Sequence, residues 1–407
     1  MKKKALSLVL ASAMVASLVG CGSSAETETP SAAETTTTEA AATEAAATET
    51  ATTEAAATEA ATTDNSDKKI AMITDSGDIT DESFNQITWE TCVAYGEANG
   101  IETQYYKPAE DTDEERINAV DLAVAEGATV VVMPGYLFGP AIAEEQDLYP
   151  DVTFIAVDVT EGDIVNLAGE SVALGSNVYI CSFQEEQAGY LAGYAAVKDG
   201  YTSLGFLGGI AVPAVIRYGF GYIQGINAAA EEMGVDVDVK YYYGGQFYGD
   251  ADITAYMDTW YGSKGVEVVF ACGGGIYTSA AEAAAKVDGK VIGVDSDQSG
   301  IIGEDITVTS AMKGLAPTVK TALDAIKDGN WESDYAGKID NLGLVSENPE
   351  DNYVQLPMET TQWDDNFTVD DYKDLVKKLY NGEIEVSSDI TAMPETEITV
   401  NDYGSIK

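Results

Sequence analysis

From residue 68 onward, short apolar runs alternate with longer amphipathic stretches, and this alternation limits the chain to a few fold classes. Unbroken apolar runs are typical of strands that are buried on both faces. Strands that alternate with helices form parallel sheets through right-handed crossovers. A first series of predicted strands lies at residues 70–74, 101–106, 129–133 and 152–158, and predicted helices lie at 82–98, 111–126 and 139–147.

The same alternation begins again after a predicted helix near residues 183–198. A second series of predicted strands lies at 203–208, 237–243, 266–272 and 290–295, and predicted helices lie near 213–233, 250–262 and 277–287. Each series has the length of one doubly wound domain, about 110 to 130 residues. The sequence therefore predicts an α/β protein of two lobes with a cleft between them, in which each lobe is a doubly wound, mainly parallel sheet.

The first twenty residues are typical of a bacterial signal peptide. Three lysines precede an apolar stretch that is too short for a stable membrane span. The stretch ends in LVGC, which resembles a lipobox. This resemblance implies that the signal is removed ahead of Cys21 and that Cys21 then carries lipid, which would anchor the protein at the extracytoplasmic face of the cell membrane. An ordinary signal peptide with a chance cysteine is the alternative.

The next segment consists almost entirely of Ala, Thr and Glu, with a glutamate at every fifth position from Glu34 to Glu59. A period of five leaves no apolar face that could pack, so this segment is expected to be a stalk. The expected organisation is a signal peptide at 1–20, a lipidated cysteine and stalk at 21–67, an N-terminal lobe at 68–180, a C-terminal lobe at 181–305, and crossover segments with a C-terminal helix at 306–407 that return across both lobes.

The charge and the residue types that are missing exclude several classes of function. Without residues 1–20 the chain keeps 18 basic and 69 acidic residues, a formal charge of −51, which excludes nucleic acid as a partner. The chain has no histidine, so it lacks the commonest general base and the usual zinc ligand. Cys92, Cys181 and Cys272 lie far apart in apolar surroundings and are expected to be buried thiols. We expect no enzyme activity, no metal and no cofactor.

Side chains with binding chemistry gather where the predicted strands end. In open parallel sheets, ligands bind beyond the carboxyl ends of the strands. Asp75 follows a predicted strand, and Asp158 and Asp295 are the last residues of two others. Aromatic residues lie in the loops after two strands, at Phe84 and Phe247. Carboxylates accept hydrogen bonds and aromatic rings offer flat apolar faces, so the sequence predicts a cleft for a flat, hydroxyl-bearing molecule.

Several ordered motifs give this chain a specific resemblance. They are DSGDITDESFNQITWE at 75–90, FxxEQAGYLAGYAA at 183–196, GGxxxPxVxxYGFGYxxG at 208–225, GGQFYGD at 244–250, IGVDSDQ at 292–298 and TSAMKG at 309–314. Together they resemble the basic membrane protein family of lipoproteins, which are substrate-binding proteins of ABC importers and several of which capture purine nucleosides. The resemblance implies a two-lobed periplasmic-binding-protein type I fold. YGFGY at 218–222 and CGGGIYTS at 272–279 depart from the family pattern, and the region after residue 331 matches least.

The resemblance also implies roles for individual residues around the base. Phe84 and Phe247 would stack on the two faces of the base, and Asp75, Asn85 and Asp158 would meet its polar edge. The alternative reading of the aspartates is that they cap the helices that follow their strands.

The ribose would be held by a second group of residues. Asp295 would accept hydrogen bonds from the ribose hydroxyls and Lys313 would donate to them. The backbone N–H groups of Gly273, Gly274 and Gly275 would complete the sugar contacts. The partners implied in this way are a purine nucleoside, an ABC transporter permease and, through the lipid, the membrane; a monomer is expected.

Three other interpretations compete with this one. A receptor for sugars or another small polar solute, in transport or in sensing, would have the same two lobes. A dinucleotide-binding enzyme is suggested by GGGIYTS followed by Asp295, but Thr278 replaces the third glycine of the fingerprint and no histidine is available for proton transfer. Residues 295–306 begin like an EF-hand loop, but Ile306 occupies the position of the bidentate glutamate.

Overall fold

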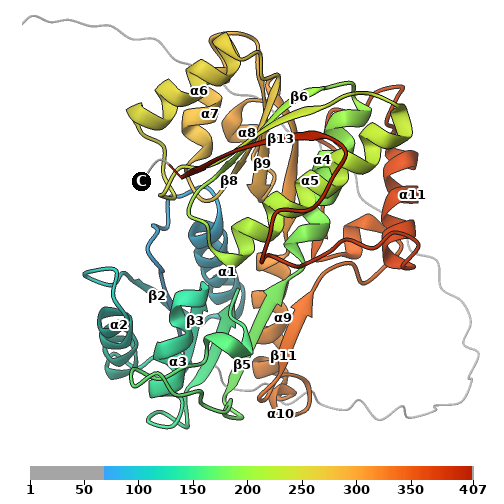
Figure 1. The fold of residues 1–407 in the computed structure, drawn as a ribbon. Coiled ribbons are helices and arrows are strands. Elements are labelled where there is room, and N and C mark those ends of the chain that lie inside the picture. Colours follow the sequence, from blue (N-terminus) through green and yellow to red (C-terminus); the bar gives the residue numbers. More distant parts are fainter. Residues whose placement is uncertain (1–67, 406–407) are drawn as a thin grey trace, which may run out of the picture. The chain divides into compact units, whose positions relative to one another are not determined.

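The computed structural model describes residues 68–405, in which two mainly parallel sheets are each covered by helices on both faces (Figure 1). The expected signal peptide, Cys21 and the stalk lie outside the described residues. Within the described part of the chain, none of the helices combines the length and the hydrophobicity that a membrane crossing requires.

The first sheet has the strand order β11-β5-β4-β3-β1-β2 and is parallel throughout. Its strands are β1 (Lys69–Ile73), β2 (Glu102–Tyr106), β3 (Val130–Pro134), β4 (Thr153–Val157), β5 (Val178–Phe183) and β11 (Ile339–Leu342). One face is covered by α2 (Asp113–Ala125) and α3 (Gly139–Glu145), and the other by α1 (Phe84–Asn99), α9 (Leu315–Asp328) and α10 (Trp331–Asp334).

The second sheet has the order β12-β10-β9-β8-β6-β7-β13, in which only the β10–β12 pair is antiparallel. Its strands are β6 (Ser203–Gly208), β7 (Asp238–Tyr243), β8 (Val268–Cys272), β9 (Lys290–Asp295), β10 (Thr307–Lys313), β12 (Val354–Gln355) and β13 (Thr399–Ser405). One face packs against α4 (Glu185–Lys198), α5 (Pro213–Met233) and α11 (Val369–Tyr380), and the other against α6 (Ala251–Ser263) and α7 (Tyr277–Ala284).

The two sheets share one strand order, because β2-β1-β3-β4-β5 in the first corresponds to β7-β6-β8-β9-β10 in the second. The residue after β4, Asp158, is therefore the topological counterpart of Asp295 at the end of β9. This architecture confirms the predicted α/β fold of two mainly parallel, doubly wound sheets. Cys92, Cys181 and Cys272 are buried free thiols, as expected.

The chain crosses between the lobes more than once. The helix α4 follows β5 of the first sheet but packs in the second lobe, and α9 follows β10 of the second sheet but packs on the first. In Figure 1 the orange segments α9, α10 and β11 accordingly lie beside the blue and green elements of the first sheet. Later segments return to the second sheet through β12, α11 and β13.

The sequence missed β5 and three of the four edge strands, β11, β12 and β13. Predicted strand ends lie within two residues of those in the structure, but the expected lobe boundary at residues 180 and 181 falls inside β5, which stays in the first sheet through Phe183. The run 178–183 leads almost directly into α4, so no turn residues separate strand from helix. The strands β11, β12 and β13 are short or polar and partly exposed, and such edge strands carry little hydrophobic signal.

Glycines allow α4 and α5 to approach each other at backbone distance. A Cβ added at Gly189 would lie 2.1 Å from the Tyr218 carbonyl oxygen, and one at Gly193 would lie 2.3 Å from that of Tyr222. From the other helix, a Cβ at Gly221 would lie 2.0 Å from the Glu186 carbonyl oxygen. No side chain fits at these distances, so the glycines fix how the first residues of α4 and α5 face each other.

We expect Gly221→Ala to destabilise the protein, because the added methyl group must push two helix backbones apart. The loss should be about 2 kcal/mol or more, as for other overpacked cores, and chemical denaturation measures it. Gly262→Ala in α6 is the matched control, since a Cβ at Gly262 meets nothing within 4 Å. This control should leave stability unchanged or raise it by up to about 1 kcal/mol. Equal unfolding midpoints for the two variants would contradict the prediction.

Candidate functional site

Loops from both lobes line one cavity of about 890 Å³, which lies at the carboxyl ends of the central strands of both sheets. This volume is in the range of sites that enclose a small molecule. The cavity brings together all ten residues that the sequence predicted for binding. They are Asp75, Phe84, Asn85, Asp158, Phe247, Gly273, Gly274, Gly275, Asp295 and Lys313.

The loop before α1 is held by a network of carboxylates and an amide. Asp81 accepts from the backbone N–H groups at the start of α1, those of Ser83, Asn85 and Gln86. The Asn85 amide nitrogen donates to Asp75 at 2.9 Å and to Asp81 at 3.0 Å, and its carbonyl oxygen accepts from the Asp75 backbone N–H. Both amide hydrogens are thus used within the loop, so Asn85 positions Asp75 and does not present a free donor to the cavity.

The three strand-end aspartates do not cap the helices that follow them. Asp81 caps α1, the Thr160–Asp163 capping box serves the 3-10 helix Glu161–Asp163, and Asp297 accepts from the backbone N–H of Ser299 at the start of α8 (Ser299–Ile302). The capping interpretation of Asp75, Asp158 and Asp295 is therefore wrong. Their side chains line the cavity instead, where Asp75 accepts from Asn85, Asp158 from Lys313 and Asp295 from Ser83.

Two of these aspartates adopt a backbone conformation that is uncommon for residues with a side chain. Asp158 has φ 61° and Asp295 has φ 65°, and they occupy equivalent positions at the ends of β4 and β9. A left-handed residue costs about 1–2 kcal/mol and persists where the surrounding structure requires it. The matched geometry places one carboxylate from each lobe at the cavity.

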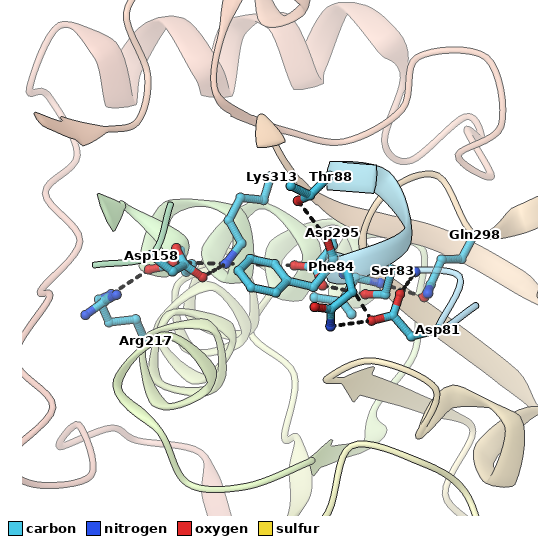
Figure 2. Close-up of polar contacts among 12 residues, drawn as sticks. Asp81, Ser83, Phe84, Thr88, Asp158, Arg217, Asp295, Gln298 and Lys313 are labelled. Carbon is cyan, nitrogen blue, oxygen red and sulfur yellow. Dashed lines mark hydrogen bonds and ion pairs between the residues drawn. The ribbon is translucent and has the colours of Figure 1, made fainter. Parts of the chain in front are cut away.

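Lys313, the last residue of β10, lies buried among these acids (Figure 2). Its Nζ is 2.5 Å from an oxygen of Asp158, 3.2 Å from Glu185 and 3.9 Å from Asp295. The same ammonium lies 5.1 Å from the centre of the Phe84 ring. Since Asp158 and Phe84 belong to the first lobe and Lys313 to the second, this cation joins the two lobes through charge and through an aromatic ring.

Glu185 and Arg217 extend this network, and neither was predicted from the sequence. Glu185, the first residue of α4, is fully buried and accepts from the Arg217 Nε at 2.5 Å. Both fall on variable positions of the motifs at 183–196 and 208–225. One signal was available for Arg217: it is one of only two arginines in the chain and lies four residues after Pro213, close to a strand end.

The network holds three carboxylates against two cations, and burial acts on each group. Burial raises the pKa of Asp158 to about 7 and also raises the pKa of Asp295. Burial would raise the pKa of Glu185 as well, but the adjacent Lys313 and Arg217 outweigh it and lower that pKa. Outside this network, burial raises the pKa of Asp75 to about 6.

Phe247 is seated by the glycine-rich turn after β8. A Cβ added at Gly273 would lie 2.8 Å from the Phe247 ring, and one at Gly209 would lie 2.5 Å from it. The Gly275 N–H donates to the Phe247 carbonyl oxygen at 2.8 Å. The expected sugar contact of the Gly275 N–H is therefore replaced by a contact within the chain. Because the aromatic loop fills this turn, the turn does not offer the open cradle that a dinucleotide pyrophosphate needs.

The lobes touch across the cavity in the described conformation. The Ser83 hydroxyl donates to Asp295 at 2.5 Å, and the Gln298 side-chain amide donates to the Glu82 carbonyl oxygen at 3.1 Å. Together with the Lys313–Asp158 pair, these bonds connect the first turn of α1 to the strand ends of the second lobe. The structure is thus that of a closed pair of lobes.

Two buried polar groups at the cavity wall have no hydrogen-bond partner among residues 68–405. They are the Oδ1 atom of Asp158 and the hydroxyl of Tyr218. A buried polar group without a partner costs about 1–3 kcal/mol, so such groups mark places where a ligand or a water molecule completes the site.

The charge of the cavity limits what it can hold. Seven carboxylates and three basic side chains line it. An anionic ligand such as a phosphate ester would be repelled, whereas a neutral molecule rich in N–H and O–H donors suits the excess of acceptors. Within the described residues, no group of three or more His, Cys, Asp or Glu side chains is arranged to hold a metal ion.

We expect the protein to lose stability as the pH rises from about 5 to 8. At pH 5 the folded state keeps protons on Asp75 and Asp158, because burial raises their pKa values to about 6 and about 7. The unfolded chain, in which aspartates have their ordinary lower pKa values, has already released these protons, so stability falls until the pH passes the folded-state values. The loss should be on the order of 1 kcal/mol for each such group, measured by denaturant unfolding at pH 5.5 and 8.0. Asp158→Asn should make the unfolding midpoint depend less on pH. A midpoint of the unchanged protein that rises between pH 5.5 and 8.0 would contradict this prediction.

Comparison with known proteins places this chain in a family. The family model described as "ABC transporter substrate-binding protein PnrA-like" matches residues 68–389. The nucleoside-binding protein BmpA of Lactococcus lactis subsp. cremoris is 28% identical over 285 residues, which cover 65% of this chain and 77% of that protein. Basic membrane protein B of Borreliella afzelii is 27% identical over 326 residues, covering 78% of this chain and 87% of that protein.

Solved structures agree at the level of the fold. An ABC transporter solute-binding protein from Aeropyrum pernix K1 superimposes with a TM-score of 0.63 at 20% identity and covers 81% of this chain and 94% of its own. One from Conexibacter woesei has a TM-score of 0.61 at 23% identity, with 79% and 99% covered. These are periplasmic binding proteins of type I fold. The chain therefore belongs to the Bmp family of substrate-binding proteins of ABC transporters, which are not enzymes and which bind a small molecule on behalf of a permease.

Proposed function

We propose that this protein captures purine nucleosides in the cavity between its lobes and delivers them to its permease. The observation that carries the proposal is that Phe84 and Phe247, from opposite lobes, line one cavity with strand-end carboxylates. Two rings on opposite lobes suit a flat heterocycle that each lobe stacks on from one side, and stacking of a base on an aromatic ring is worth about 1–3 kcal/mol. The printed name of the Lactococcus relative supports the same ligand class.

The polar edge of the base is assigned to the first lobe. Asp75 and Asp158 accept hydrogen bonds from ring or amino N–H groups, and Asn85 acts indirectly by holding the Asp75 carboxylate in place. Carboxylates are the acceptors that such edges require. This assignment revises the expected direct contact of Asn85.

The ribose is assigned to the second lobe. Asp295 accepts from ribose hydroxyls, Lys313 donates to ribose oxygens, and the Tyr218 hydroxyl supplies a further polar contact. Gly273 and Gly274 act mainly by giving Phe247 its place at the cavity wall. The acidic cavity favours nucleosides over nucleotides, because a phosphate would add negative charge beside seven carboxylates.

Capture works through closure. Open and closed states are in equilibrium, and a ligand that contacts both lobes favours the closed state by its differential affinity. The bonds from Ser83 to Asp295 and from Gln298 to Glu82 stabilise that state. A lipid on Cys21 would hold the receptor at the extracytoplasmic face of the membrane; the relative from Pyrococcus abyssi, 24% identical, is named a lipoprotein.

Titration calorimetry with nucleosides and free sugars tests the ligand class. We expect inosine, guanosine or adenosine to bind and pentoses and hexoses to bind far more weakly. Phe84→Ala should lower nucleoside affinity at least about tenfold, because one stacking face is lost. Tyr380→Ala, which removes an exposed ring on α11, is the control and should leave the nucleoside affinity unchanged. Binding of free sugars alone would reject the nucleoside proposal in favour of a sugar receptor.

Tyr218→Phe tests the ribose contacts with a single-atom change. The hydroxyl has no partner in the described residues, so its removal should leave the unfolding midpoint unchanged or raise it. Nucleoside affinity should fall by about fivefold to thirtyfold, equal to one hydrogen bond of about 1–2 kcal/mol. Tyr222→Phe is the matched control: its hydroxyl is equally buried without a partner on the same helix, but Tyr222 does not line the cavity. Equal affinities for both variants would remove Tyr218 from the site.

Small-angle scattering tests closure. Addition of nucleoside should reduce the radius of gyration, because the ligand shifts the population to the closed state. Tight binding with an unchanged scattering profile would contradict closure as the mechanism of capture.

A further inference from the structure

Arg217 is anchored at one edge of its guanidinium group and open at the other. It lies near the start of α5 and lines the cavity. Its Nε donates to Glu185, which is fully buried and is also bound by Lys313. Its two terminal nitrogens have no hydrogen-bond partner among residues 68–405, and the side chain keeps 15% of its surface exposed. The free side of the guanidinium therefore offers fixed donors to a molecule in the cavity.

Asp158 offers an acceptor in the same region of the cavity. One of its oxygens is paired with Lys313, and no ion pair joins Asp158 to Arg217 in the described part of the chain. Arg217 and Asp158 belong to one chain of contacts, because Arg217 binds Glu185 and Lys313 binds both Glu185 and Asp158, and Lys313 also lies 5.1 Å from the centre of the Phe84 ring (Figure 2). The wall next to the stacking position therefore presents a guanidinium donor and a carboxylate acceptor that do not satisfy each other.

This pair has a definite complement among purines. A 6-oxopurine, hypoxanthine or guanine, carries acceptors at O6 and N7 and a donor at N1–H. Arginine recognises O6 and N7 of guanine by paired hydrogen bonds, and a carboxylate accepts from N–H. Adenine instead carries a 6-amino donor and an N1 acceptor, which would face the guanidinium and the carboxylate with the wrong polarity.

We infer that Arg217 selects 6-oxopurine nucleosides over adenosine by donating to the O6 edge of the base, with Asp158 as the acceptor beside it. This inference rests on the proposed nucleoside function and specifies the base. The alternative is that Arg217 is purely structural and only neutralises the buried Glu185. That role requires no more than a positive charge at this position. A lysine supplies that charge but not the planar fork, and this difference separates the two roles.

Calorimetric titration of the full chain with inosine, guanosine, adenosine and purine riboside tests the inference. Inosine and guanosine should bind about tenfold or more tightly than adenosine, which is the discrimination expected for one paired arginine contact. Purine riboside, which lacks any group at position 6, should lose most of this advantage. Since this series needs no variant, it remains informative even if substitutions at Arg217 disturb folding.

Arg217→Lys should then weaken inosine binding about tenfold while adenosine binding changes less than about twofold, with thermal unfolding as the check on folding. Arg116→Lys is the matched control: Arg116 is the other arginine of the chain and does not line the cavity, so the ratio of affinities should persist. Adenosine binding as tightly as inosine, or a preference that survives Arg217→Lys, would overturn the role of Arg217 and leave nucleoside capture standing. Absence of binding by every nucleoside would overturn the proposed function itself.

Discussion

The buried Lys313 ammonium needs acidic partners from both lobes, and much of the cleft is organised around that need. Removing a charge from water costs roughly several kcal/mol, even after the protein relaxes. A buried cation therefore persists only where carboxylates surround it. Asp158 comes from the first lobe. Glu185, at the start of α4, and Asp295, at the end of β9, come from the second lobe. Separation of the lobes would remove Asp158 from the Lys313 ammonium. Closure of the cleft is therefore coupled to the electrostatic stabilisation of this buried cation.

The symmetry of the fold supplies those acids at matching places. Because both sheets use the same strand order, the loops after β4 and β9 meet across the cleft, and each begins with an aspartate in the left-handed conformation. The glycine contacts between α4 and α5 then fix the position of Glu185 relative to Arg217. The Arg217 guanidinium in turn binds Glu185 and offsets its negative charge. Backbone packing at the helix interface thus determines electrostatics at the cavity.

A receptor of this kind works by retaining a ligand long enough to be recognised, and the cleft has the features for that task. Its rings come from opposite lobes, its acceptors exceed its donors, and its central cation bridges the halves. A neutral heterocycle with N–H and O–H groups fits these features, whereas an anion does not. Since the family binds and releases without chemistry, the absence of histidine from the chain is no handicap to it.

The sequence by itself determined the fold class, nearly all central strands and helices, and the set of strand-end residues that meet in the cavity. Hydrophobic alternation and strand-end position are local properties, so they survive in the linear order. Only the tertiary structure decided that the Asn85 amide donates both hydrogens to Asp75 and Asp81. It also decided that the glycine turn packs against Phe247 and that Glu185 links Arg217 to Lys313. These facts depend on which groups far apart in the chain become neighbours, and on which hydrogen bonds are already used, and no local pattern encodes either.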